Sequence, residues 1–102
     1  MEEQFKKIWR EEDESNFKEK HVPVVVVDED KVSVKVGGIE HPSEPEHFIQ
    51  WIALLDGEIE IERIYLTQFI KPKVVFHIKD KLERLKVRIF CNLHGTWENI
   101  QK

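Results

Sequence analysis

The chain has 102 residues, of which 40% are hydrophobic and 10% aromatic, enough to build one domain around a single modest core. No apolar run approaches the roughly 20 residues of a membrane-spanning helix, and the N-terminus lacks the basic and apolar regions of a signal peptide. Cys91 is the only cysteine, so an internal disulfide is excluded and we expect a cytoplasmic protein.

The formal net charge of −4 is unevenly distributed along the chain. Residues 28–62 contain ten acidic and two basic side chains, whereas residues 71–88 contain seven basic and two acidic ones. The basic stretch alternates with apolar residues, which is typical of a solvated face of a β-sheet. Because no aromatic-rich basic surface or nucleic-acid-binding motif accompanies it, we expect neither nucleic acid nor a membrane as a partner.

The first 16 residues are polar, and we separate them as an N-terminal segment from a domain that spans residues 17–102. Phe5, Ile8 and Trp9 recur at helical spacing, which predicts a short helix with one apolar edge. The acidic residues from 11 to 14 then favour a chain that leaves this helix.

A β-hairpin is predicted after this segment. Residues 22–27 are almost all valine, with Pro23 near the start, where a strand tolerates the loss of a hydrogen-bond donor. Residues 31–36 alternate between valine and polar side chains, which predicts a second strand with its valines facing inward. The acidic residues 28–30 form the turn between the two strands.

The rest of the chain is also predicted to form strands. They cover residues 47–55, 58–66, 73–79, 84–91 and a last short segment that includes Trp97. Asp56 and Gly57 provide a hairpin turn, after which we expect Ile59 and Ile61 to face inward, with a β-bulge at residues 62–63 where the alternation changes phase. The pattern indicates an all-β protein, an immunoglobulin-like antiparallel β-sandwich of about seven strands.

The strand over residues 84–91 ends at Cys91, and His94 follows in a tight turn that Gly95 permits. The alternation of this strand places the thiol on its apolar face. A thiolate and an imidazole close together are ligands suited to iron, copper or zinc. Alternatively, Cys91 is a small buried hydrophobic residue and His94 is a surface residue without a metal.

Most of the histidines lie outside the regular interiors of the predicted strands. These are His21, His41, His47 and His94. Strand ends and loops at one end of a sandwich can converge, so these four imidazoles can meet at one site. His77, in contrast, lies in mid-strand in phase with Lys73 and Lys79, and we predict that it points outward and has no role in the site.

Three blocks of sequence contain the four histidines and the cysteine. They are Glu-Lys-His-Val-Pro at residues 19–23, His-Pro at 41–42 followed by Glu-His at 46–47, and Cys-Asn-Leu-His-Gly at 91–95 followed by Trp-Glu at 97–98. In this order, and from about residue 17 to residue 99, the chain resembles the superoxide reductase family. It is most similar to the single-iron members of that family, the neelaredoxins. The three blocks together make the resemblance specific.

The resemblance implies one mononuclear non-haem iron and names its ligands. Four are equatorial imidazoles and one is an axial thiolate: His21, His41, His47, His94 and Cys91. Glu19 matches the carboxylate that can occupy the sixth position in the ferric state. Lys20 matches the lysine near the open position. There its positive charge attracts superoxide, and its ammonium group donates a hydrogen bond to the bound anion. An axial thiolate pushes electron density onto the metal, as axial cysteine does in haem enzymes.

The resemblance also implies an activity and partners. The expected reaction is the one-electron reduction of superoxide to hydrogen peroxide, a detoxification that needs an external electron donor resembling rubredoxin. Family members commonly assemble as homo-oligomers, so a tetramer is expected. The chain departs from two-iron relatives because it lacks the cysteines of their second iron domain, and its N-terminal segment is longer and more acidic than expected.

Three other types of protein compete with this interpretation. A cupredoxin-like electron-transfer protein also places a cysteine and histidines at one end of a β-sandwich, but it usually adds an axial methionine, and Met1 is the only methionine here. A structural zinc site needs four ligands, which leaves the fifth unexplained. A metal-free immunoglobulin-like binding domain would account for the strands but not for the three blocks.

Overall fold

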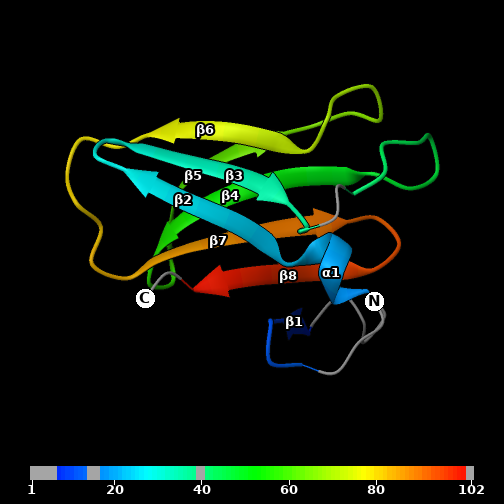
Figure 1. Ribbon diagram of the computed structural model, residues 1–102, viewed down its shortest axis with the longest axis horizontal. Helices are drawn as coiled ribbons and strands as arrows, with labels where there is room; N and C mark the ends of the chain where they lie inside the picture. The colour runs from blue at the N-terminus through cyan, green and yellow to red at the C-terminus, as the bar shows by residue number, and fades with distance from the viewer. Residues whose placement is uncertain (1–6, 14–16, 39–40, 101–102) are drawn as a thin grey trace.

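A computed structural model describes residues 7–13, 17–38 and 41–100 of the chain. These residues form eight strands and one short helix: β1 (Ile8–Trp9), α1 (Lys18–His21), β2 (Pro23–Asp28), β3 (Lys31–Val36), β4 (Ile49–Asp56), β5 (Ile59–Tyr65), β6 (Lys73–His77), β7 (Leu85–Cys91) and β8 (Gly95–Ile100). The strands make a five-stranded sheet in the order β1-β8-β7-β4-β5 and a three-stranded sheet in the order β2-β3-β6. Figure 1 shows the two sheets facing each other, so the predicted all-β sandwich is confirmed.

The predicted hairpin of β2 and β3 is confirmed, with Val25 opposite Val34. The valines of β3 are buried, as the alternation predicts, and Glu29 in the turn has a positive φ of 56°. The strands predicted over residues 73–79 and 84–91 are confirmed as β6 and β7. No helix among the described residues is long and apolar enough to cross a membrane.

The prediction that Ile59 and Ile61 face inward is wrong, since they are 65% and 50% exposed. β5 is an edge strand, and a three-stranded sheet cannot cover the full width of a five-stranded one. The predicted β-bulge is confirmed, although it lies slightly earlier than residues 62–63. Leu54 pairs with Glu62 whereas the next residue of β4 pairs with Glu60, which leaves Ile61 as the extra residue.

The N-terminal helix is wrong for residues 7–13, where Ile8 and Trp9 form the strand β1, parallel to β8. The ring of Trp9 stacks on that of Trp97 with 5.4 Å between centroids. A helix of so few residues is marginal in water, so pairing with β8 and this aromatic contact outweigh the helical spacing. Residues 1–6, including Phe5, and 14–16 lie outside the described residues, and the division of the chain at residue 17 stays a prediction.

The core lies between the two sheets and reaches the end of β7. Its most buried side chains come from β3, β4, β6, β7 and β8: Val32, Val36, Ile52, Leu54, Phe76, Val87, Ile89, Cys91 and Trp97. Cys91 is fully buried, so its sulfur is part of this core. The thiol therefore points inward, as the alternation of β7 predicts.

Glu98 on β8 is a buried carboxylate on the outer side of the five-stranded sheet, with a fully buried side chain. It accepts hydrogen bonds from Nε of Arg88 at 2.8 Å and from Nε of Arg10, and Nζ of Lys86 lies 3.9 Å away. Burial alone would raise the pKa of Glu98, but the hydrogen bonds from Arg88 and Arg10 outweigh it and hold that pKa below its usual value. Glu98 thereby fastens the chain after β1 to β8.

Glu98→Ala should lower the free energy of unfolding by about 3 kcal/mol, because it leaves Arg88 and Lys86 without their buried carboxylate. The folded-state pKa of Glu98 lies below the unfolded value, so this stabilisation is present at neutral pH and is lost as pH falls through the folded-state pKa. Urea unfolding of both proteins across pH would measure it. The control Glu60→Ala removes an exposed partner of Arg63 and should cost less than about 1 kcal/mol. Equal losses in the two variants would contradict the account.

Candidate metal centre

One end of the sandwich brings together the segments that carry the predicted ligands. α1, the loop after β3, the start of β4 and the turn between β7 and β8 lie at this end (Figure 1). Gly95, with a φ of 84°, closes the turn and pairs with Cys91. Asn92 fixes this turn to the neighbouring loop, because its Oδ1 accepts from the Phe48 backbone at 3.0 Å and its Nδ2 donates to the Glu46 carbonyl at 2.9 Å.

Four predicted ligands converge at this end. One donor atom each from His21, His47, Cys91 and His94 lies within 4.8 Å of all the others. Nδ1 of His94 is 3.3 Å from Nε2 of His21 and 3.9 Å from Sγ of Cys91. Three imidazole nitrogens and one sulfur therefore surround a space of the size that a metal ion needs.

The fifth predicted ligand, His41, lies beside this group but is not one of the four that converge. Its Nε2 is 3.0 Å from Nε2 of His21, and its ring centroid is 4.6 Å from that of His47. His41 is as deeply buried as His21. The structure thus places His41 within reach of the same space, and its role as a fifth ligand stays a prediction.

Backbone carbonyls fix which ring nitrogens face the centre. Nδ1 of His21 donates to the Phe17 carbonyl at 2.6 Å, and Nδ1 of His41 donates to the Pro42 carbonyl at 2.7 Å. A carbonyl can only accept, so the proton of each neutral ring must be on Nδ1 and the lone pair on Nε2. Metal-binding histidines are commonly oriented in this way, with the ring nitrogen that faces away from the metal donating to a carbonyl.

Burial keeps these imidazoles neutral. It lowers the pKa of His21 to about 3 and that of His41 to about 4, and it lowers the pKa of His94 as well. The Nε2 lone pairs of His21 and His41 therefore face each other at 3.0 Å without a proton between them. Nε2 of His47 is also buried without a hydrogen-bond partner in the described structure. A cation bound by these nitrogens would remove the repulsion between the two lone pairs and would give Nε2 of His47 a partner.

Burial also favours the uncharged form of the Cys91 side chain. Burial raises the pKa of the Cys91 thiol, while hydrogen bonds from the backbone N–H groups of Leu93 and His94 act in the opposite direction. A metal ion favours the thiolate much more strongly than these hydrogen bonds do. Soft sulfur together with borderline imidazole suits iron, copper or zinc and does not suit calcium or magnesium. The residues present therefore fit an iron ion.

Two aromatic side chains hold the ligand rings in place. The ring of Phe17 stacks on His94 with centroids 4.0 Å apart, and Trp97 stacks on His21 at 5.2 Å while its Nε1 donates to the His94 carbonyl at 3.0 Å. The supporting roles of Phe17 and Asn92 were not predicted from the sequence. The spacing of four between Phe17 and His21, and the position of Asn92 between two ligands, are the signals that could have found them.

The other histidine and the two charged candidates are on the surface. His77 on β6 is exposed and lies outside the converging group, as predicted. Glu19 and Lys20 are exposed on α1, directly before His21. The positive charge of Lys20 contributes to lowering the pKa of His41, although less than burial does, so its field reaches the centre.

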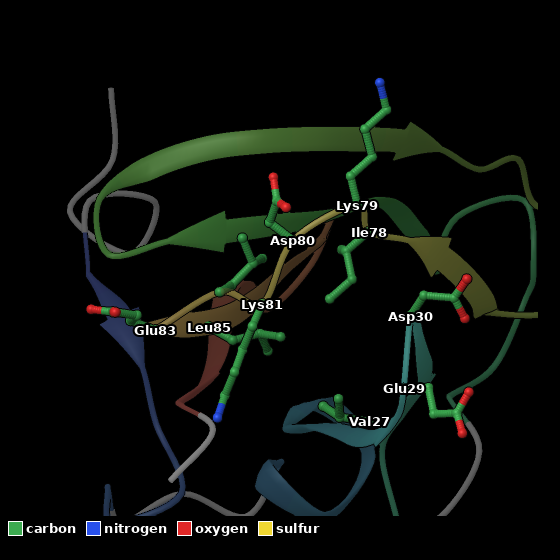
Figure 2. Close-up of a pocket in the computed structure, with 10 residues that line it drawn as sticks. Val27, Glu29, Asp30, Ile78, Lys79, Asp80, Lys81, Glu83 and Leu85 are labelled. Atoms are coloured by element: carbon green, nitrogen blue, oxygen red, sulfur yellow. The ribbon is translucent and has the colours of Figure 1, made fainter.

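A second hollow lies between the β2–β3 turn and the segment from β6 to β7, with a volume of about 590 Å³ (Figure 2). Val27, Ile78 and Leu85 contribute apolar walls, and charged side chains such as Lys79 and Lys81 surround the opening. It is lined by neither histidine nor cysteine. This hollow therefore lacks the ligands of a transition-metal site, and the group of donor atoms found among the described residues is the cluster around Cys91.

Proteins similar to this chain belong to a family whose members include superoxide reductases. Residues 13–100 match the model of the family described as Desulfoferrodoxin. The chain belongs to the desulfoferrodoxin family. A superoxide reductase of Pyrococcus abyssi is 40% identical over 97 residues, which cover 79% of this chain and 84% of that protein. The resemblance predicted from the three sequence blocks is thereby confirmed.

Another family member, a desulfoferrodoxin homolog of Archaeoglobus fulgidus, is 40% identical over 82 residues, which cover 80% of this chain and 63% of that protein. The chain spans less than two thirds of the length of that relative. Among solved structures, the neelaredoxin of Ignicoccus hospitalis, a superoxide reductase, superposes with a TM-score of 0.78 at 27% identity over 92% of this chain and 91% of that one. The likeness to single-iron members thus covers nearly all of both chains.

A divalent metal ion added to the metal-free protein at about pH 8 should release about one proton per ion, because Cys91 must lose its proton whereas neutral His21 and His41 have none to lose. Calorimetry in buffers of different ionisation enthalpy would count the protons. Cys91→Ser should lower both the affinity and the proton count. His77→Ala should behave as the wild type does. Unchanged proton release in the serine variant would contradict ligation by the sulfur.

Proposed function

We propose that the protein is a superoxide reductase, in which superoxide, one electron and two protons give hydrogen peroxide. The observation that carries the proposal is the convergence of Cys91 with three histidines in a protein of the desulfoferrodoxin family. Iron, held by these four residues and by His41, would supply the electron by changing between its ferrous and ferric states. Family membership favours this function over the cupredoxin-like alternative.

The buried ligands would set the properties of the electron-transfer centre. The sulfur of Cys91 lies in the core and receives two backbone N–H groups, so water is kept from it and its charge is partly balanced. The carbonyls of Phe17 and Pro42 fix the protonated nitrogens of His21 and His41, so neither ring has to rotate or lose a proton when the metal binds.

Lys20 would guide the substrate. Superoxide is an anion, and a chain with a net charge of −4 repels it in general. The ammonium group of Lys20 is exposed on α1, and its field reaches His41, so it creates a local attraction toward the centre. Its three N–H groups can also donate hydrogen bonds to the arriving anion. Water at the exposed end of the sandwich can supply the two protons that the reaction consumes.

Glu19 is the candidate for the sixth ligand in the ferric state, in keeping with the family resemblance. Its carboxylate is exposed one residue before Lys20. His21 at the end of α1 is buried, so the Glu19 side chain would have to reach the centre while His21 stays in place. A rubredoxin-like protein remains the proposed electron donor, and a homo-oligomer, a tetramer by resemblance, remains the proposed assembly.

Lys20→Ala should slow the second-order reaction of the ferrous protein with superoxide by about ten-fold, the low end of electrostatic steering effects. Lys20→Arg should retain most of the rate. Added salt should slow the wild type more than the alanine variant, because screening acts on the charge that was removed. Pulse-generated superoxide at several ionic strengths would measure these rates.

Glu19→Gln is the matched control, because it changes the neighbouring charge in the opposite direction. It should not slow the encounter with superoxide, but it should alter the visible spectrum of the ferric protein and the response of that spectrum to pH. Equal rates and equal salt dependence for the wild type and Lys20→Ala would show that the lysine is only a surface charge. A ferric spectrum unchanged by Glu19→Gln would exclude ligation by this carboxylate.

A further inference from the structure

The outer face of the three-stranded sheet carries a row of lysines beside exposed valines. Cross-strand pairing places Val24, Lys35 and Lys73 in one row and Val26, Ser33 and Val75 in the next. The three valines are 40%, 58% and 49% exposed, and a shallow groove of about 490 Å³ runs between them. We call this surface the valine–lysine face: Val24, Val26, Ser33, Lys35, Lys73 and Val75.

The two lysines form an unfavourable pair. Lys35 and Lys73 lie directly opposite each other on neighbouring strands, and like charges in such positions destabilise a sheet. Neither has a carboxylate within 4.0 Å among the described residues, whereas Lys86 and Arg88 on the other sheet both contact Glu58. Within the described part of the chain, Lys86 and Arg88 are thus paired with a carboxylate, whereas Lys35 and Lys73 have no counter-charge.

This face adjoins the metal centre. Val36, next to Lys35, accepts a hydrogen bond from the backbone N–H of His41 at 3.2 Å. β2 begins two residues after His21, and its first residue, Pro23, is opposite Val36. The ends of β2 and β3 that carry the first row of the face thus also position two of the predicted metal ligands.

We infer that the valine–lysine face is the docking surface for an acidic one-electron carrier protein that returns the electron consumed at the metal centre. The inference rests on the proposed function, because each superoxide reduced requires one electron from outside the protein. Exposed valines bordered by charges match the composition of a protein interface with an apolar centre and a polar rim. Unpaired lysines would attract an acidic carrier to this face, although the net charge of the chain repels it elsewhere.

A second copy of the chain fits this face less well. The acidic strand β5, with Glu58 directly before it, is the obvious counterpart. However, Arg63 donates to Glu60 and Lys86 contacts Glu58, so two of these carboxylates already have partners. Lysines on a β-sheet surface can also serve only to prevent aggregation. Self-association and a merely solvated face are therefore the two outcomes that would count against the inference.

The experiment uses the double variant Lys35→Glu/Lys73→Glu and the control Lys79→Glu/Lys81→Glu, which makes the same change in net charge at the opposite end of the sandwich, where Figure 2 shows both lysines. Reduced rubredoxin is the acidic probe. Stopped-flow spectroscopy follows its reduction of the ferric protein at several salt concentrations. The first variant should react about ten-fold more slowly than the wild type at low salt, and the control at most about three-fold more slowly. Reduction by ascorbate should differ little between the two variants.

Binding is mapped separately by amide chemical shifts of the full chain loaded with zinc. Zinc-substituted rubredoxin should shift amides of β2, β3 and β6, and the basic protein ferrocytochrome c should not. Shifts centred elsewhere, or equal rates for the two variants, would overturn the inference and leave a solvated face only. Shifts at this face that grow with protein concentration without rubredoxin would identify self-association instead.

The two proposals fail in different ways. If the iron-loaded protein does not react with superoxide, the proposed function fails, whereas the zinc-loaded protein still shows whether rubredoxin docks at this face. If the reaction occurs and the Lys35→Glu/Lys73→Glu variant accepts electrons as fast as the control variant, the docking surface alone is wrong.

Discussion

The imidazole nitrogens of His21 and His41 lie 3.0 Å apart, buried and neutral, and the rest of the site depends on that contact. Carbonyl groups hold the proton of each neutral ring on the far side, so the lone pairs of the two Nε2 atoms face each other in a buried place. Such an arrangement costs free energy in the metal-free protein. A metal ion bound between these nitrogens, as the proposed function requires, would remove this cost and would couple metal binding to folding.

The contact between His21 and His41 follows from the positions of the strand ends. The pairing of β2 with β3 places the chain just before β2 beside the chain just after β3, and these segments carry His21 and His41. The tight turn at Gly95 returns the chain so that His94 approaches Cys91. Trp97 then packs against His21. The same strand register determines which side chains of β2, β3 and β6 face solvent. The metal centre and the valine–lysine face therefore both depend on how these strands pair.

Strand alternation was enough to predict the hairpin of β2 and β3, the strands β6 and β7, and the inward thiol of Cys91, because these segments face one apolar layer. It failed for Ile59, since a local pattern does not reveal which strand will lie at the edge of a sheet. Helical spacing failed as a guide at Trp9 because the contact with Trp97 joins residues far apart in sequence. The blocks around the histidines predicted which residues would meet, but only the structure shows the carbonyls that orient their rings.

The most direct test of the central claim is the metal content and the visible spectrum of the oxidised protein after loading with iron. The account predicts one iron per chain and a thiolate-to-iron charge-transfer band that gives a blue colour, because Cys91 is the only cysteine in the sequence. The band should disappear in Cys91→Ser even if iron remains bound. Failure of the protein to bind one iron per chain, or a band that survives the loss of the sulfur, would contradict the account.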